Sequence, residues 1–174
     1  MSTPEHQDRD LQSGELIGER ATLVSYLRYQ RRTLELKCSG LDAAALARRS
    51  VEPSNLSLLG LVRHLAGVEQ HWFRQVMAGQ QVTRHYRSDA DRDADFNGAA
   101  PDPHMVEQAW DTWREEVAFA ERLVADAPDI AVRARHDDGT IALREVLVHM
   151  IEEYARHNGH ADLLRERIDG RVGQ

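Results

Sequence analysis

Several kinds of residue are scarce in this chain of 174 residues, and each shortage excludes a class of protein. The single cysteine, Cys38, excludes both an intramolecular disulfide framework and a metal site built from cysteines alone. The longest apolar runs are far shorter than the roughly 20 residues that a membrane-spanning helix needs. The N-terminus lacks the basic and then apolar pattern of a signal peptide, so we expect a cytoplasmic protein.

Basic residues are also fewer than acidic ones. Lys and Arg total 22 against 29 Asp and Glu, which gives a net charge of −7 with His neutral. No run rich in Lys and Arg offsets this balance, so neither duplex nucleic acid nor an anionic membrane is an expected partner. Hydrophobic residues make up 41% of the chain, which is enough for a sizeable core. The length predicts one domain over residues 15–170, with a flexible leader at 1–14 and a tail at 171–174.

Helical periodicity dominates the rest of the sequence. Four stretches carry apolar residues at helical spacing, mostly at alternating steps of three and four, which is typical of the seam of a packed bundle, and no stretch predicts a strand. The sequence therefore predicts an all-α protein, a four-helix bundle. The expected helices cover about residues 15–37, 57–77, 103–127 and 140–168, with a short helical turn at 42–49.

The segment between the second and third expected helices is unusually long. Residues 80–100 form a polar stretch with Asp, Arg, Asn and Gly, and connections of this length are uncommon inside a compact bundle. We interpret the stretch as a crossover or a functional loop, which allows the second and third helices to run parallel. The third helix has Asp102 as its N-cap and Pro103 as its first residue.

One polar residue lies on the apolar seam of the fourth helix. That residue is His157, and Glu153 and His160 project from adjoining turns of the same face. On the second helix, His64 also borders the apolar seam. A carboxylate that faces a core costs several kcal/mol unless it is paired or bound to a metal. If the second and fourth helices are neighbours, His64, Glu153 and His157 converge at the middle of the bundle.

Two imidazoles and one carboxylate suit zinc, nickel or ferrous iron, with coordination positions left open for water or substrate. The positions of His64, Glu153 and His157 also have explanations without a metal. Histidines near a core face are often hydrogen-bonded structural groups, and a Glu-His pair four residues apart is a common surface ion pair. The sequence contains no Glu-x-x-His motif, which disfavours the di-iron bundles that require it on two helices.

Two stretches carry a family resemblance, LLGLVRHLAGVEQHWF (58–73) and LVHMIEEYARHNGHADLLRERIDG (147–170). The chain resembles the DinB-like superfamily of four-helix bundles, in the branch related to mycothiol-dependent maleylpyruvate isomerase and the mycothiol S-transferases. The most specific part of this resemblance is the motif His-x-Gly-His-x-Asp at 157–162. It implies one divalent metal, with zinc favoured over nickel or iron, held by His64, Glu153 and His157. It also implies a homodimer.

The resemblance and the spacing suggest roles for further residues. His160 would lie next to the metal as a catalytic or orienting group, although an interhelical hydrogen bond explains it equally well. His149 is the main rival ligand, and His71 could reach the rim of the same cleft, so both are candidates for substrate contacts. Arg63 and Arg156 flank the proposed ligands in sequence, and we expect both side chains to point into solvent, with the alternative that one of them reaches an anionic substrate.

Three protein ligands leave a metal open, which is typical of a catalytic site. The resemblance implies chemistry that depends on a low-molecular-weight thiol such as mycothiol, and the chain, with Lys37 as its one lysine, has a composition typical of a GC-rich genome. The first hypothesis is therefore a metal-dependent S-transferase that joins this thiol to an electrophile. One alternative is a hydrolase or isomerase that uses water activated by the metal. Another is a non-catalytic stress or interaction protein with a structural metal.

Overall fold

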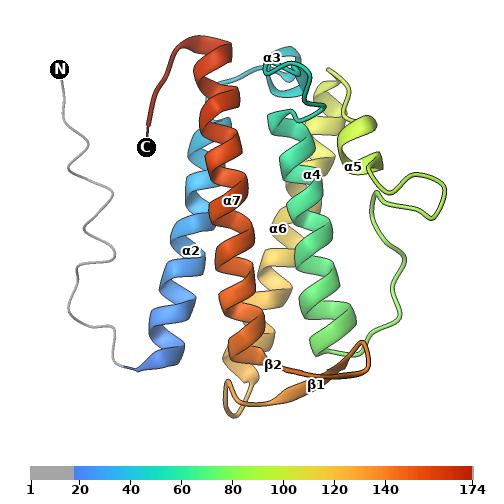
Figure 1. The fold of residues 1–174 in the computed structure, drawn as a ribbon, viewed down its shortest axis with the longest axis vertical. Helices are drawn as coiled ribbons and strands as arrows, with labels where there is room; N and C mark the ends of the chain where they lie inside the picture. Colours follow the sequence, from blue (N-terminus) through green and yellow to red (C-terminus); the bar gives the residue numbers. More distant parts are fainter. Residues whose placement is uncertain (1–17, 174) are drawn as a thin grey trace.

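The computed structural model describes residues 18–173 and contains four long helices (Figure 1). The predicted leader at 1–14 and the first residues of the first expected helix lie outside the described residues. The long helices are α2 (Glu19–Cys38), α4 (Leu58–Glu69) with its continuation η1 (Gln70–Met77), α6 (Pro103–Asp126) and α7 (Leu143–Asp169). Two short helices complete the helical part, α3 (Ala43–Ala47) and α5 (Ala94–Asn97).

The four long helices form the predicted bundle. Helices α2 and α7 run in one direction and pack along each other, whereas α4 and α6 run in the opposite direction and pack along each other (Figure 1). The chain after η1 passes up the outside of the bundle to α5 before α6 begins, so α4 and α6 are parallel (Figure 1). Both the four-helix bundle and the long crossover are thereby confirmed.

Side-chain caps fix where three of the helices begin. The Asp102 carboxylate accepts a hydrogen bond from the His104 N–H at 2.9 Å, and Pro103 follows as the first residue of α6. Asp42 caps α3 and Ser57 caps α4 in the same way. These starts agree with the sequence prediction because a cap depends on residues within one turn of each other.

The prediction that the chain has no strand was wrong. Strands β1 (Arg133–His136) and β2 (Gly139–Ala142) form an antiparallel hairpin, with Asp137 in the left-handed region at its turn. Because residues 139–142 pair in this hairpin, α7 begins at Leu143 and not at the predicted Thr140. Strands of four residues are too short to show a clear alternation in the sequence. The hairpin packs against η1 at one end of the bundle.

The second helix also departs from the prediction, because its last eight residues are π-helical. The Ala78 N–H donates to the Phe73 carbonyl at 3.0 Å, five residues back. A π-helical turn is wider than an α-helical one and is frequent at functional sites. Here it changes the direction in which His71, Trp72 and Gln75 project, and all three line a cavity that is described below.

A buried ion pair crosses the middle of the core. Arg31 on α2 donates to both carboxylate oxygens of Glu69 on α4, at 2.8 and 2.7 Å. The Tyr154 hydroxyl donates to the same carboxylate at 2.8 Å, and the Trp113 indole N–H donates to that hydroxyl at 2.8 Å. We call these four residues the core network. All four are buried, and together they link all four long helices through hydrogen bonds.

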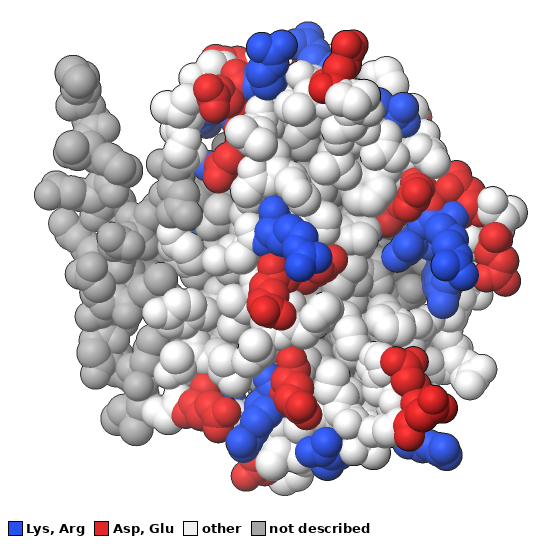
Figure 2. All heavy atoms as spheres, in the orientation of Figure 1, with Lys and Arg blue, Asp and Glu red and all other residues white. Residues whose placement is uncertain are grey.

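The surface of the bundle is polar. Figure 2 shows acidic and basic side chains interspersed over the face that is also seen in Figure 1. Among residues 18–173, no helix combines the length and the apolar character that crossing a membrane would require.

Candidate metal centre

Helices α4 and α7 bring three of the predicted site residues together. His64 comes from α4, whereas Glu153 and His157 lie one turn apart on α7. The Oε1 atom of Glu153 lies 3.2 Å from Nε2 of His64 and 3.3 Å from Nε2 of His157. One ligand atom from each residue lies within 4.8 Å of the other two. The convergence that the sequence made conditional on neighbouring helices is therefore present in the fold.

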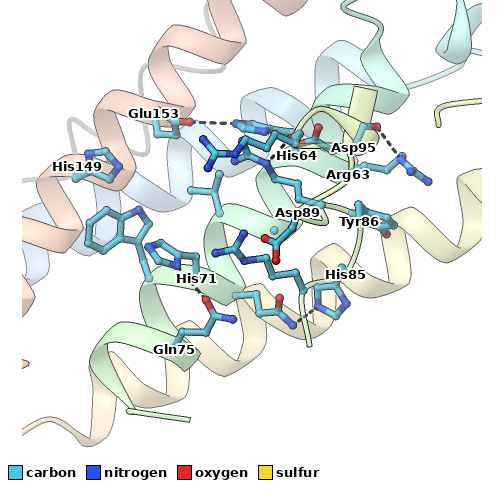
Figure 3. Close-up of a pocket in the computed structure, with 17 residues that line it drawn as sticks. Arg63, His64, His71, Gln75, His85, Tyr86, Asp89, Asp95, His149 and Glu153 are labelled. Carbon is cyan, nitrogen blue, oxygen red and sulfur yellow. Dashed lines mark hydrogen bonds and ion pairs between the residues drawn. The ribbon is translucent and has the colours of Figure 1, made fainter. Parts of the chain in front are cut away.

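A fourth residue, Asp95 on α5, orients the His64 ring. Its Oδ2 atom lies 2.8 Å from Nδ1 of His64, and its side chain is buried. The His64 ring also stacks on Phe96, with the two ring centroids 5.0 Å apart. Donation of the Nδ1 proton to Asp95 leaves Nε2 directed at Glu153 (Figure 3). A carboxylate behind a ligating histidine is the usual support of a metal ligand, because it fixes the tautomer and the ring orientation.

The charges of the cluster shift its pKa values. Burial disfavours the charged imidazole of His64, but hydrogen bonds to Asp95 and Glu153 outweigh burial and raise its pKa. Hydrogen bonds from His157 and His64 hold the pKa of the Glu153 carboxyl far below its ordinary value. Glu153 therefore remains ionised at neutral pH and is shared by two imidazoles. A bound cation would take the place of the imidazole protons, as in metal sites whose ligands release protons on binding.

The donor set and its spacing fit a divalent metal. Around a tetrahedral zinc ion with ligand distances of about 2.0–2.1 Å, neighbouring ligand atoms lie about 3.3 Å apart. The separations of 3.2 and 3.3 Å between Glu153 and the two histidines match this value. Two imidazoles, one carboxylate and a supporting carboxylate behind His64 are also the chemistry that zinc accepts in proteins.

The cluster opens onto a cavity of about 550 Å³. His64 and Glu153 line this cavity, and so do His71 and His149, the two residues expected to contact substrate. Figure 3 shows His149 and Glu153 of α7 on the side opposite Tyr86 and His85 of the crossover. A ligand in the cavity would therefore contact the exposed side of the cluster.

Comparison with protein families gives the decisive match. The sequence model of the Mycothiol-S-transferase family matches residues 22–170, nearly the whole described chain. The chain belongs to this family. Comparisons with curated proteins and with solved structures found no match. Membership agrees with the DinB-like helical bundle and implies mycothiol as the cosubstrate.

In this member of the mycothiol S-transferase family, His160 lies behind the cluster. Its Nδ1 atom lies 3.3 Å from Nδ1 of His157, and it is not among the residues that line the cavity. Burial, followed by the charges of His157 and Arg156, lowers the pKa of His160. This placement favours the orienting role over a direct contact with substrate.

Sequence reasoning was wrong about Arg63 and overlooked Asp95. Arg63 does not point into solvent: it is buried, donates to the backbone carbonyls of Ala94 and Asp95 at 2.9 and 2.8 Å, and lies over the Tyr86 ring. It thereby holds α5, and with it Asp95, against the metal ligand His64. The one feature of the sequence that could have pointed to Asp95 is its position beside an aromatic residue, Phe96, in an otherwise polar loop. Arg156 is exposed, as predicted.

Proposed function

We propose that this chain is a metal-dependent mycothiol S-transferase that joins the thiol to a carbon electrophile. His64, Glu153 and His157 hold one divalent cation, for which zinc fits the donor set best. The observation that supports this most strongly is the position of the three ligand atoms, which meet beside a 550 Å³ cavity in a chain of this family. Such a cavity has the size of a small-molecule site.

The cation would contribute a positive charge that lowers the pKa of a bound thiol, so that the sulfur is present as a reactive thiolate. The protein residues hold the metal ligands in position and contact the substrates. Asp95 and His160 contact the two imidazoles on the nitrogen that faces away from Glu153, and so hold both rings in place. His71 and His149 lie in the cavity beside Trp72 and are proposed to contact the substrates.

The overall reaction is a substitution at carbon. A sulfur–carbon bond forms between the thiol and the electrophile, and the bond from that carbon to its leaving group breaks. The leaving group departs with the electron pair, and the proton of the thiol passes to solvent. No oxidant or reductant is needed.

The test is conjugation of mycothiol to 1-chloro-2,4-dinitrobenzene by protein purified without an affinity tag. We expect turnover that requires both the thiol and a divalent metal, with one equivalent of metal found by elemental analysis. His157→Ala should abolish turnover and lower metal content, because it removes one of three ligands. His104→Ala is the matched control, since His104 is exposed at the start of α6, and it should behave as the wild type.

Two other outcomes of these assays would each favour one of the alternative functions. Turnover of a hydrolysable or isomerisable substrate with metal but without thiol would contradict the proposal and favour the hydrolase or isomerase. A protein that binds metal tightly, with neither turnover nor affinity for mycothiol, would favour the non-catalytic alternative.

The proposal also includes a cytosolic location and a homodimer. A transferase that uses a free thiol needs a reducing compartment, which the cytosol provides. The dimer is implied by the family resemblance, and light scattering on the purified protein would reveal a mass twice that of the chain.

A further inference from the structure

The cavity beside the proposed metal centre has a basic side that the proposed function leaves unused. Three arginines of the crossover line it: Arg84, Arg87 and Arg92. We call residues 84–92 the arginine loop. Figure 2 shows a group of basic side chains at the right edge of the molecule, where Figure 1 places the crossover, bordered by acidic ones. The arginine loop also contains Asp89 and Asp91, so three arginines against two aspartates give it a formal charge of +1 with His neutral, in a chain whose net charge is −7.

The start of the arginine loop is fixed to the bundle. The Gln70 side-chain amide donates to the Thr83 carbonyl at 3.1 Å. The Nε2 atom of His85 lies 2.9 Å from Oε1 of Glu116, a buried carboxylate on α6 whose other oxygen accepts from Arg74 at 2.5 Å. Arg84 therefore lies between two anchored residues, and Arg87 and Arg92 follow them.

The end of the loop is fixed as well, through the same contacts that support the metal ligand. Arg63 holds the carbonyls of Ala94 and Asp95, and the Asp95 carboxylate is bound to His64. A backbone that is fixed at both ends loses little further conformational entropy when a ligand binds, so the entropic cost falls mainly on the exposed arginine side chains.

The arginine side chains have few partners within the protein. Arg87 donates to the backbone carbonyl of Arg92 at 2.5 Å, which stabilises the fold of the loop. Within residues 18–173, the guanidinium groups of Arg84 and Arg92 make no hydrogen bond or ion pair. Two of the three acidic residues that line the cavity are already bound to His64, and Asp89 is the third. Four arginines line the cavity, the three of the loop and Arg63, which is bound to backbone carbonyls.

We propose that the arginine loop binds a carboxylate of the electrophile, so that this transferase prefers anionic electrophiles. The inference rests on the proposed function, because it places the second substrate beside the thiol. Guanidinium groups bind carboxylates through paired, charge-assisted hydrogen bonds. Mycothiol carries sugar hydroxyls and no carboxylate, so the anionic group belongs to the electrophile.

The test compares two matched electrophiles, 4-(chloromethyl)benzoate and 4-(chloromethyl)benzamide. In both, the thiol sulfur displaces chloride from the benzylic carbon, and the two differ in charge at the far end of the ring. Each kcat/KM is divided by the rate of the same reaction without protein. We expect the wild type to prefer the benzoate on the order of tenfold, the size of one charge-assisted contact. Arg84→Gln with Arg92→Gln should remove this preference, and Arg84→Lys with Arg92→Lys should retain part of it.

The matched control is Arg122→Gln, because Arg122 is exposed on α6 and does not line the cavity. It removes one positive charge from the molecule and should leave the preference unchanged. The KM for mycothiol should also stay unchanged in the Arg84 and Arg92 variants. Equal normalised turnover of the benzoate and the benzamide by the wild type would overturn the inference, as would a preference that survives Arg84→Gln with Arg92→Gln.

A binding measurement separates this inference from the proposed function. Isothermal titration of 4-methylbenzoate into the metal-loaded wild type should show binding that weakens with added salt and is lost in the Arg84→Gln, Arg92→Gln variant. If neither electrophile is conjugated, the proposed transferase function fails, and this titration still decides the carboxylate site. Absence of 4-methylbenzoate binding to the wild type would overturn that site.

Discussion

Two clusters of buried polar groups lie close together in this bundle and differ in what they leave unsatisfied. The core network surrounds the Glu69 carboxylate, and the candidate metal centre surrounds the Glu153 carboxylate. Glu69 accepts two hydrogen bonds from Arg31 and one from Tyr154, and the Tyr154 hydroxyl also accepts one from Trp113. Every polar group there faces another one, and Glu69 does not line the cavity.

The metal centre uses similar groups without saturating them. One oxygen of Glu153 faces two imidazole nitrogens, and His64 and Glu153 also line the cavity. The comparison separates buried polar clusters into structural ones and ligand-binding ones, according to whether all their hydrogen-bonding groups have partners within the protein. A saturated cluster stabilises one arrangement of helices, whereas a cluster with free coordination positions is available for a ligand.

The largest expected effect is on stability, in the core network. Glu69→Gln leaves the Arg31 charge buried without a counter-ion, which costs about 3–5 kcal/mol of unfolding free energy. Chemical denaturation should show this loss, while zinc affinity of the folded protein stays near that of the wild type. Replacing the pair together, with Arg31→Met and Glu69→Leu, should recover most of the stability. A loss below about 1 kcal/mol in Glu69→Gln would show that the network is not a structural element.

The next effect is on metal affinity, with little change in stability. Asp95→Asn keeps the shape of the side chain but removes the charge behind His64, and we expect roughly 10- to 100-fold weaker zinc binding. Competition with a chromophoric chelator measures this change. Asp89→Asn is the matched control from the same crossover, because Asp89 does not contact His64, and its affinity should equal that of the wild type. Equal affinities of the two variants would contradict the role of Asp95.

The smallest effect is a pH dependence at Glu116, a saturated carboxylate beside the cavity. Burial opposes its ionisation, but hydrogen bonds from His85 and Arg74 outweigh burial and lower its pKa below the ordinary 4.5. A carboxyl whose pKa is lower in the folded state stabilises the fold above the unfolded pKa, and this contribution is lost as the pH falls through the folded pKa. The wild type should therefore lose stability more steeply below about pH 4.5 than Glu116→Gln.

Thermal unfolding of both proteins between pH 3 and pH 7 checks this expectation. Parallel curves would show that Glu116 is not held in its ionised form by the fold. The same variant removes the charge that His85 contacts, so a weaker anchor of the crossover should also be visible as faster proteolysis within residues 80–93.

The bundle and the ligand candidates could be predicted because they depend on local spacing. Apolar residues at helical steps define each seam, and caps such as Asp102 act within one turn of the helix that they start. Glu153 and His157 are four residues apart on one helix, so their proximity follows from helix geometry. The contact of the Tyr154 hydroxyl with Glu69, in contrast, depends on another helix and could not be predicted.

Periodicity within single helices thus determined the class of fold and the ligand candidates of the metal centre, and the length of the polar stretch at 80–100 indicated the crossover. Tertiary structure decided the rest: the hairpin before α7, the π-helical end of the second helix, the burial of Arg63, the contact of Asp95 with His64 and the orientation of the arginine loop. The physical reason is sequence separation. The burial of Arg63, the contact of Asp95 with His64 and the orientation of the arginine loop all depend on a loop that packs against a helix distant in sequence. Hydrophobic periodicity reports only on contacts within one element, so it does not predict them.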